Sequence, residues 1–175
     1  MIKDKNREDI YLIVLVLLGL YLSLIENLIP KPFPWMKIGL SNVAILIALE
    51  KFNSKMAIKA IILRVFIQAL MLGTLFTPGF IISISAGTVS TFFMIFLYKF
   101  RKYLSLLSIS CASAFLHNLL QLLVVYFLLF RNMSLNSKSI VIFIGIFLFL
   151  GLVTGLITGV IAEKLNLRKL KKFIE

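Results

Sequence analysis

The stretch IVIFIGIFLFLGLVTGLITGVIA, residues Ile140 to Ala162, decides the class of this protein. It has no charged side chain over 23 residues, and about 20 helical residues are enough to cross the hydrocarbon core of a bilayer. The whole chain is similar in character, because 61% of its 175 residues are hydrophobic and its mean hydropathy is +1.04. Soluble domains contain about 45 to 50% apolar residues. The sequence therefore predicts an all-helical integral membrane protein.

Six apolar segments, separated by polar or proline-rich breaks, predict a single bundle of six transmembrane helices. The first is expected to be a retained helix, because it is long enough to span a bilayer and no signal-peptide cleavage site follows it. The second is too short to cross unaided, so it is either tilted within a thinned bilayer or packed among its neighbours. The expected transmembrane domain covers residues 10–162, between a cytoplasmic N-terminus at 1–9 and a basic amphipathic tail at 163–175. The expected helices are 10–29, 38–49, 57–76, 80–98, 104–130 and 140–162.

The basic residues predict the orientation of this bundle. The chain has 19 Lys and Arg against seven Asp and Glu, a net charge of +12. With six crossings, fourteen of the basic residues fall on one side, four fall on the other and Arg64 lies within a helix. Lysine and arginine are retained on the cytoplasmic face, which predicts that both termini are cytoplasmic. Nucleic-acid binding is not expected, because the basic residues lie in short gaps and form no stripe with stacking aromatics.

Polar residues within the apolar segments are candidates for a binding site. An ionisable group at membrane depth costs at least about 2.5 kcal/mol, so its presence requires an explanation. Arg64 and Gln68, like His117 and Gln121, are four residues apart and share a helix face. With the predicted topology, these groups gather in the middle-to-outer half of the bundle. The candidate ligand-binding residues are Glu26, Asn42, Arg64, Gln68, His117, Asn118 and Gln121.

Each candidate also has an interpretation without a ligand. Glu26 could be solvated at the outer interface, and Arg64 could pair with Glu26 or with backbone carbonyls. His117, Asn118 and Asn42 could form hydrogen bonds between helices. His117 and Cys111 are the sole histidine and cysteine, too few for a metal site of three or four ligands. No metal and no cofactor are therefore expected.

Small residues recur at four-residue spacing in the last apolar segment, at Gly151, Gly155 and Gly159, and more weakly in the first, at Gly19 and Ser23. Such a groove lets another helix approach closely, because lipid tails provide no hydrophobic drive and van der Waals contact must act instead. The partner is either another helix of this chain or another subunit.

The sequence does not suggest a self-contained enzyme. Aspartate occurs only at Asp4 and Asp9, so no aspartate-rich motif is present to hold the magnesium that diphosphate chemistry usually requires. There is also no phosphate-binding P-loop and no recognisable catalytic triad.

Several short motifs, taken in order, resemble a known family. The motifs are Leu24 to Pro34, Lys37 to Asn42, Arg64, Leu72 to Thr74, Pro78 to Phe80 and His117 to Gln121. Over about Tyr11 to Ala162, the sequence resembles the Gx transporter family, whose members are also labelled heptaprenyl diphosphate synthase component I.

That family is similar to the substrate-binding S components of energy-coupling factor (ECF) transporters. The resemblance implies a multi-pass protein of the prokaryotic cytoplasmic membrane that captures a micronutrient or cofactor precursor from outside. It also implies two kinds of partner, a transmembrane coupling subunit and two ABC-type ATPases. Gly19 and Ser23 stand where S components often dock the coupling subunit. The loop that closes over the ligand would contain Pro30, Pro32, Phe33, Pro34 and Trp35. The alternative function is an accessory membrane subunit of prenyl diphosphate or quinone biosynthesis.

Overall fold

The computed structural model describes residues 2–30, 37, 39–130 and 138–164. All regular structure in this part of the chain is helical, as the hydropathy predicted. The six helices that it contains are α1 (Ile2–Leu28), α2 (Asn42–Lys51), α3 (Ser54–Met71), α4 (Pro78–Tyr98), α5 (Leu106–Leu129) and α6 (Lys138–Lys164).

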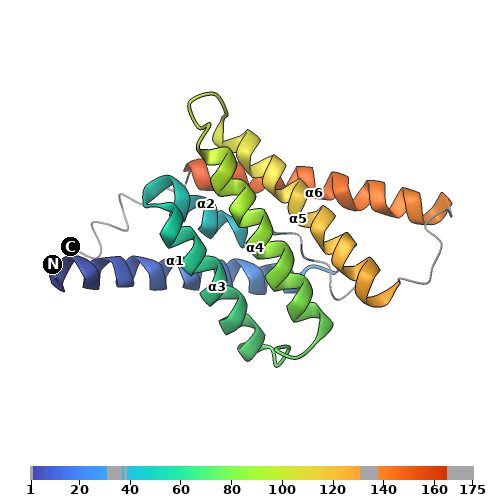
Figure 1. The fold of residues 1–175 in the computed structure, drawn as a ribbon, viewed down its shortest axis with the longest axis horizontal. Coiled ribbons are helices and arrows are strands. Elements are labelled where there is room, and N and C mark those ends of the chain that lie inside the picture. Colours follow the sequence, from blue (N-terminus) through green and yellow to red (C-terminus); the bar gives the residue numbers. More distant parts are fainter. Residues whose placement is uncertain (1, 31–36, 38, 131–137, 165–175) are drawn as a thin grey trace.

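The helices form one bundle around the short helix α2. In Figure 1, α1 and α6 run in opposite directions, so that α1 begins and α6 ends toward the left of the view. Along the chain, α3 packs on α4, α4 on α5 and α5 on α6. Helix α2 contacts α1, α3, α4 and α6, which makes it the centre of the bundle.

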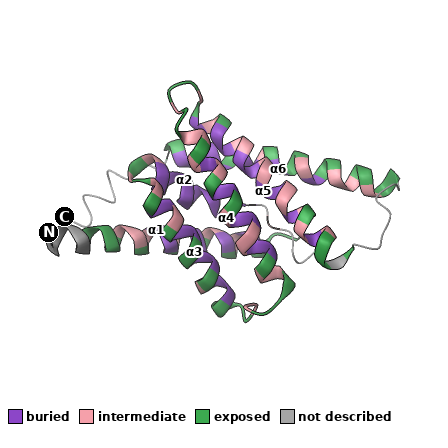
Figure 2. Ribbon diagram, viewed as in Figure 1, coloured by how far each residue is buried: buried purple, intermediate pink, exposed green. Residues whose placement is uncertain are grey.

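Four of the helices are long and apolar enough to cross a membrane: α1, α4, α5 and α6. Helix α3 has 18 residues but includes Lys55, Lys59 and Arg64, and α2 has only 10 residues, about 15 Å of helix. The long helices each carry exposed stretches (Figure 2). Large apolar side chains are among the exposed residues, including Leu17 at 58% exposed, Phe127 at 65% and Phe149 at 64%. Exposed apolar surface of this extent fits contact with lipid.

Helix α2 is packed among its neighbours, the second of the two interpretations that its length allowed. Every residue from Asn42 to Leu49 is buried, so all its faces are covered by protein (Figure 2). The helix begins at Asn42 rather than at 38, because Gly39 has φ +96°, a conformation that interrupts a helix and that glycine adopts readily. It ends at Lys51, because Asn53 already caps α3 by accepting a hydrogen bond from the Met56 backbone N–H at 2.8 Å.

Helix α3 ends five residues earlier than position 76, where the apolar run ends. Gly73, at φ +65°, takes the left-handed conformation that closes a helix. The backbone N–H of Thr74 then donates to the Ala69 carbonyl at 2.9 Å, and that of Gly73 to Leu70 at 3.3 Å. The other helix ends lie within three residues of expectation, except that α1 extends back to Ile2. Residues 165–175, most of the predicted basic tail, lie outside the described residues.

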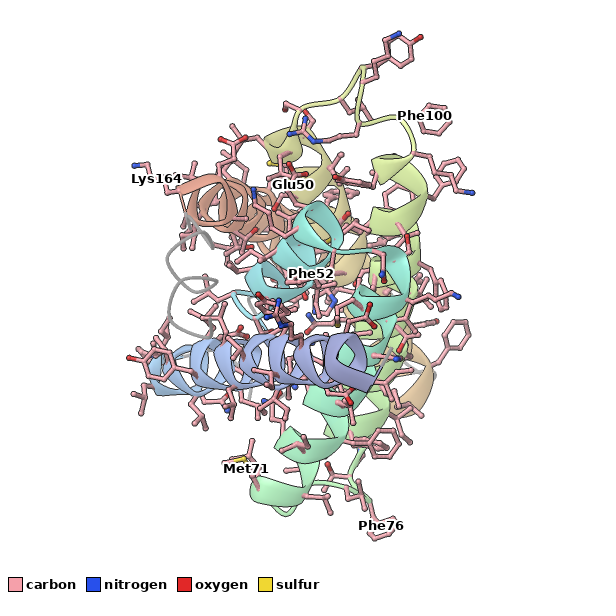
Figure 3. All side chains as sticks on the ribbon, turned by 90° about the vertical axis from the view of Figure 1, so that its left-hand side faces the viewer. Glu50, Phe52, Met71, Phe76, Phe100 and Lys164 are labelled. Carbon is pink, nitrogen blue, oxygen red and sulfur yellow. The ribbon has the colours of Figure 1, made fainter. Side chains whose placement is uncertain are left out.

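The bundle has two distinct ends. At one end α3 passes into α4, with Met71 and Phe76 exposed (Figure 3). At the opposite end lie Glu50, at the end of α2, and Phe100, between α4 and α5 (Figure 3). There Glu50 accepts a hydrogen bond from the Tyr98 hydroxyl at 2.9 Å and pairs with Arg101 at 3.4 Å. We call these the α3–α4 end and the Glu50 end.

Candidate functional site

The centre of the polar interior is the short connector that leads into α2, residues Gly39 to Ser41. Glu26, in the last turn of α1, is 2% exposed, and one of its carboxylate oxygens accepts the backbone N–H groups of Gly39 and Leu40, each at 3.1 Å. These charge-assisted bonds are stronger than bonds between neutral groups. Glu26 is therefore buried and bonded to the connector, which excludes the solvated interpretation.

Gln121 of α5 holds the chain just before this connector. Its side-chain oxygen accepts the Lys37 backbone N–H at 3.0 Å, and its side-chain nitrogen donates to the Lys37 carbonyl at 2.9 Å. The amide thus satisfies both backbone groups of one residue, as a neighbouring β-strand would. Gln121 is fully buried. It joins α5 to a residue 84 positions earlier in the chain.

Arg64 of α3 crosses the interior between several elements. Its guanidinium donates through Nη1 to the Ser41 hydroxyl. Its aliphatic stem runs against Gly19 of α1, where an added Cβ would stand 3.0 Å from the Arg64 Cδ. The Glu26 carboxylate acts electrostatically on Arg64, so a cation and an anion compensate each other in the interior. The Arg64 Nε is buried with no hydrogen-bond partner in the described structure.

The remaining polar candidates are engaged by neighbouring helices. His117 of α5 lies 3.2 Å from the Ser90 hydroxyl of α4 through Nδ1 and hydrogen-bonds the Ala86 backbone. Asn118 donates to the Phe147 carbonyl of α6 at 2.9 Å. Asn42 is the first residue of α2, with its amide nitrogen 3.2 Å from where a Cβ on Gly39 would stand. His117 and Asn118 thus form the interhelical contacts that were the alternative to a ligand role.

A cavity of about 110 Å³ lies at the α3–α4 end, one helical turn beyond Arg64. The end of α1, Lys37, the last turns of α3 and the first turns of α4 form its wall. Its polar lining residues are Asn27, Lys37, Gln68, Thr74 and Ser83, and its other lining residues are Val65, Ala69, Leu72, Gly79 and Phe80. The cavity therefore offers one cation, two amides and two hydroxyls beside an apolar wall.

A family model described as heptaprenyl diphosphate synthase component I matches residues 15–165, most of the chain. The chain belongs to this family. The membership predicted from the sequence motifs is thereby confirmed. Searches of curated proteins and of solved structures found no match.

In this member of the heptaprenyl diphosphate synthase component I family, the seven predicted ligand-binding residues lie in three places: around the connector, in the cavity wall and in the α5–α6 interface. Glu26, Arg64 and Gln121 surround the connector, with Asn42 and His117 beside it. Gln68 alone of the seven lines the cavity, and Asn118 lies in the α5–α6 interface. In the predicted gating loop, Pro30 is exposed, whereas Pro32, Phe33, Pro34 and Trp35 lie outside the described residues.

The small residues all pack inside the chain. A Cβ on Gly155 would stand 2.6 Å from the Cys111 Cα of α5, and Gly151 and Gly159 make similarly close approaches to α5. Gly19 is covered by Arg64 and Ala44, and Ser23 is 3% exposed. The α1 pair that the resemblance implies as a docking face is thus turned inward. The exposed face of α1 contains Ile13, Leu17, Tyr21 and Leu24 instead.

Lys37 is the residue of the site that was not among the sequence candidates. In the sequence, Lys37 is one of the basic residues between apolar segments and the first residue of the family motif Lys37 to Asn42, but neither feature marks it as a ligand-binding residue. One local signal could have identified Lys37. Gly39 follows two residues later, and a glycine that permits a left-handed turn can bring the preceding residues back onto the bundle. Ser41, the partner of Arg64, lies in the same family motif, which does not by itself predict that contact.

Proposed function

We propose that this chain is the S component of an ECF-type, ATP-driven importer, which captures a small micronutrient or cofactor precursor from the outer side of a prokaryotic cytoplasmic membrane. It acts as a binding protein without catalytic activity and crosses the membrane six times, with both termini in the cytoplasm. A coupling membrane subunit and two ABC-type ATPases are its partners.

The observation that supports this proposal best is a charged and polar interior that leads to a cavity at one end of the bundle. Glu26, Arg64 and Gln121 are each no more than 5% exposed. Gln68, one helical turn beyond Arg64 on α3, lines the cavity. Buried ionisable groups at membrane depth are expensive and usually mark a substrate path. A ligand would enter at the α3–α4 end, and a rearrangement driven by the ATPases would release it on the other side.

The distribution of positive charge supports this direction of capture. The segment between α4 and α5, at the Glu50 end, contains Lys99, Arg101 and Lys102, whereas residues 72–77, at the α3–α4 end, contain no basic residue. Positive residues favour the cytoplasmic side, so the cavity would open outward.

The alternative, an accessory subunit of a prenyl diphosphate synthase, has the name of the family in its favour. The cavity favours the importer. It is smaller than the 150 Å³ cavity that admits one benzene molecule, too small to enclose a long prenyl chain, and half of its lining residues are polar. The lack of aspartate beyond Asp4 and Asp9 also argues against prenyl transfer by this chain.

Affinity purification of the tagged chain from native membranes separates the two functions. The importer predicts that a coupling membrane protein and two ABC-type ATPases co-purify in fixed ratio. Recovery of a soluble prenyl synthase subunit without ATPases would reject it.

Thiol labelling of intact cells tests the orientation. In a Cys111→Ser background, Phe76→Cys should react with a membrane-impermeant reagent, and Tyr103→Cys should react only after the cells are opened. Both side chains are highly exposed, at 97% and 82%, so accessibility within the protein is not limiting. The opposite labelling pattern would reverse the topology.

A further inference from the structure

One face of α3 forms a wall of the cavity at the α3–α4 end. The lining residues that α3 contributes are Val65, Gln68, Ala69 and Leu72. Residues three or four apart lie on the same face of a helix, so the Gln68 side chain is on the face that adjoins the cavity. Gln68 is only 5% exposed, which means that the surrounding protein covers nearly all of it.

The side-chain amide of Gln68 makes no hydrogen bond with any residue that the structure describes. Among the described residues, the buried polar atoms that lack a partner and are sealed from all accessible space are Arg64 Nε, Ser113 Oγ and Asn118 Oδ1. The amide atoms of Gln68 are not sealed in this way, so they reach accessible space, and the space that Gln68 borders is the cavity. Buried polar groups usually have a hydrogen-bond partner, which indicates that an occupant of the cavity bonds this amide.

The Ser83 hydroxyl, on the α4 side of the cavity, restricts the polarity of that occupant. It donates its proton to the Gly79 carbonyl at 2.6 Å, so its oxygen can only accept a further hydrogen bond. The Gln68 amide can both donate and accept. A ligand with acceptors alone, such as a carboxylate or a ketone, would leave the Ser83 oxygen and the Gln68 carbonyl without a donor. A ligand that satisfies both residues therefore has a donor beside its acceptor.

Gln121 shows how a buried glutamine of this bundle recognises such a group. Its amide accepts the Lys37 backbone N–H at 3.0 Å and donates to the Lys37 carbonyl at 2.9 Å. Gln68 has the same side chain, and Val65 and Phe80 in the same cavity wall provide an apolar surface for the rest of a ligand. The volume of about 110 Å³ limits the enclosed part of the ligand to a few heavy atoms.

We propose that this cavity binds a small neutral molecule through an amide-type edge, an N–H donor next to a carbonyl acceptor, which pairs with the acceptor and the donor of the Gln68 side chain. Amides, lactams and ureas have such an edge. The inference rests on the proposed function, since it names the class of ligand that the importer would capture. It assigns recognition to Gln68, whereas Glu26 and Arg64 hold the connector into α2.

Three probes with the same heavy-atom skeleton separate the classes of ligand. Propionamide has a donor and an acceptor, butanone has a methyl group in place of the amino group, and propionate has a charged oxygen there. Thermal unfolding of the purified full chain is followed with a thiol-reactive dye, because the single cysteine, Cys111, is only partly exposed in the folded state. Sodium chloride at equal ionic strength is the blank for propionate. A ligand that binds the native state raises the unfolding temperature, so propionamide should give a larger shift than butanone or propionate.

Three variants test whether Gln68 makes the contact. Gln68→Leu should weaken propionamide binding about tenfold or more, because both hydrogen bonds of the pair are lost, and it should remove the preference over butanone. Ala69→Leu keeps Gln68 but fills the cavity from the same face of α3, so it should also reduce the propionamide shift. Asn118→Leu is the matched control: it removes a buried amide from the α5–α6 interface, and the propionamide shift should stay unchanged.

Three results would overturn the inference: a shift with butanone or propionate that equals or exceeds the shift with propionamide, an unchanged propionamide shift in Gln68→Leu, or no response to propionamide in the unmodified chain. The comparison of the probes needs no variant, so it decides the matter even if Gln68→Leu does not fold. None of these results would reject the importer itself. Co-purification with ABC-type ATPases judges that proposal independently, so the failure of one can be told from the failure of the other.

Discussion

Two regions of this bundle bury polar groups, and the hydrogen bonds that satisfy those groups differ between the regions. At the α5–α6 interface, the polar groups are neutral and bond directly across the helix pair: the Ser110 hydroxyl lies 2.6 Å from that of Thr158 and donates to the Gly155 carbonyl at 2.7 Å. Around the connector into α2, by contrast, the groups include two opposite charges, Glu26 and Arg64, and their partners are backbone and side-chain groups of a turn. The first region joins two regular helices, whereas the second holds an irregular segment inside the bundle.

The difference shows what each kind of polar group can do at membrane depth. Neutral hydroxyls between close-packed helices contribute only about 0.6 kcal/mol each on average, so glycine contact must supply most of the attachment. Irregular backbone at membrane depth is tolerated only where protein or a water-filled cavity covers it. The connector meets this condition through Glu26 and Gln121, and the cavity lies directly beside it.

The largest expected effect comes from breaking the charge balance of the connector region. Arg64→Met leaves the Glu26 carboxylate buried without its cation, which should destabilise the fold by about 3 to 5 kcal/mol. Unfolding in increasing concentrations of a denaturing detergent measures this change. Arg101→Met is the matched control, because Arg101 pairs with Glu50 in a partly exposed bridge and should cost less than about 1 kcal/mol. A double variant, Arg64→Met with Glu26→Gln, should recover much of the loss; failure to recover would show that the two charges do not compensate each other.

A smaller effect is expected at the α5–α6 interface. In Gly155→Ala the new Cβ would stand 2.6 Å from the Cys111 Cα, which belongs to the backbone and cannot move aside, so overpacking should cost about 1 to 3 kcal/mol. Gly145→Ala makes the same change on the same helix where nothing lies within 4 Å, and it should not destabilise. The same detergent unfolding compares the two variants. Equal stability would mean that α6 does not approach α5 through its glycines.

The smallest change in stability is expected for Gln121→Leu, a variant that affects the connector and not the α5–α6 interface. Gln121→Leu removes both bonds to the Lys37 backbone, and the net loss should be about 1 kcal/mol, because Lys37 is only half-buried and water can replace the amide. Its local result is more informative: hydrogen exchange should accelerate at the backbone amide of Lys37.

Asn118→Leu serves as the comparison for that measurement. It removes a bond to the Phe147 carbonyl in the α5–α6 interface and should leave exchange at Lys37 unchanged. If both variants accelerate exchange at Lys37 equally, the two regions are one cooperative unit and the contrast between them is incorrect.

Much of this architecture could be predicted because it depends on local composition. The apolar runs predicted helices that α1, α4, α5 and α6 confirm, and the glycine spacing of α6 predicted a close approach. The burial of Arg64, Gln68 and Gln121 followed from their position inside apolar runs. The end of α3 was placed too late, because an apolar run continues past Gly73 and hydropathy does not register a left-handed turn.

The sequence alone therefore determined that the chain is a helical membrane protein of the heptaprenyl diphosphate synthase component I family, and that its interior contains charge. Only the tertiary structure decided which hydrogen-bond partners those polar groups have. Gln121 meets the Lys37 backbone, Glu26 meets Gly39 and Arg64 meets Ser41. The physical reason is that periodicity reports which face of a helix is covered, whereas a hydrogen-bond partner depends on the approach of segments far apart in the chain. That approach left Gln68 and Lys37 on the wall of one cavity.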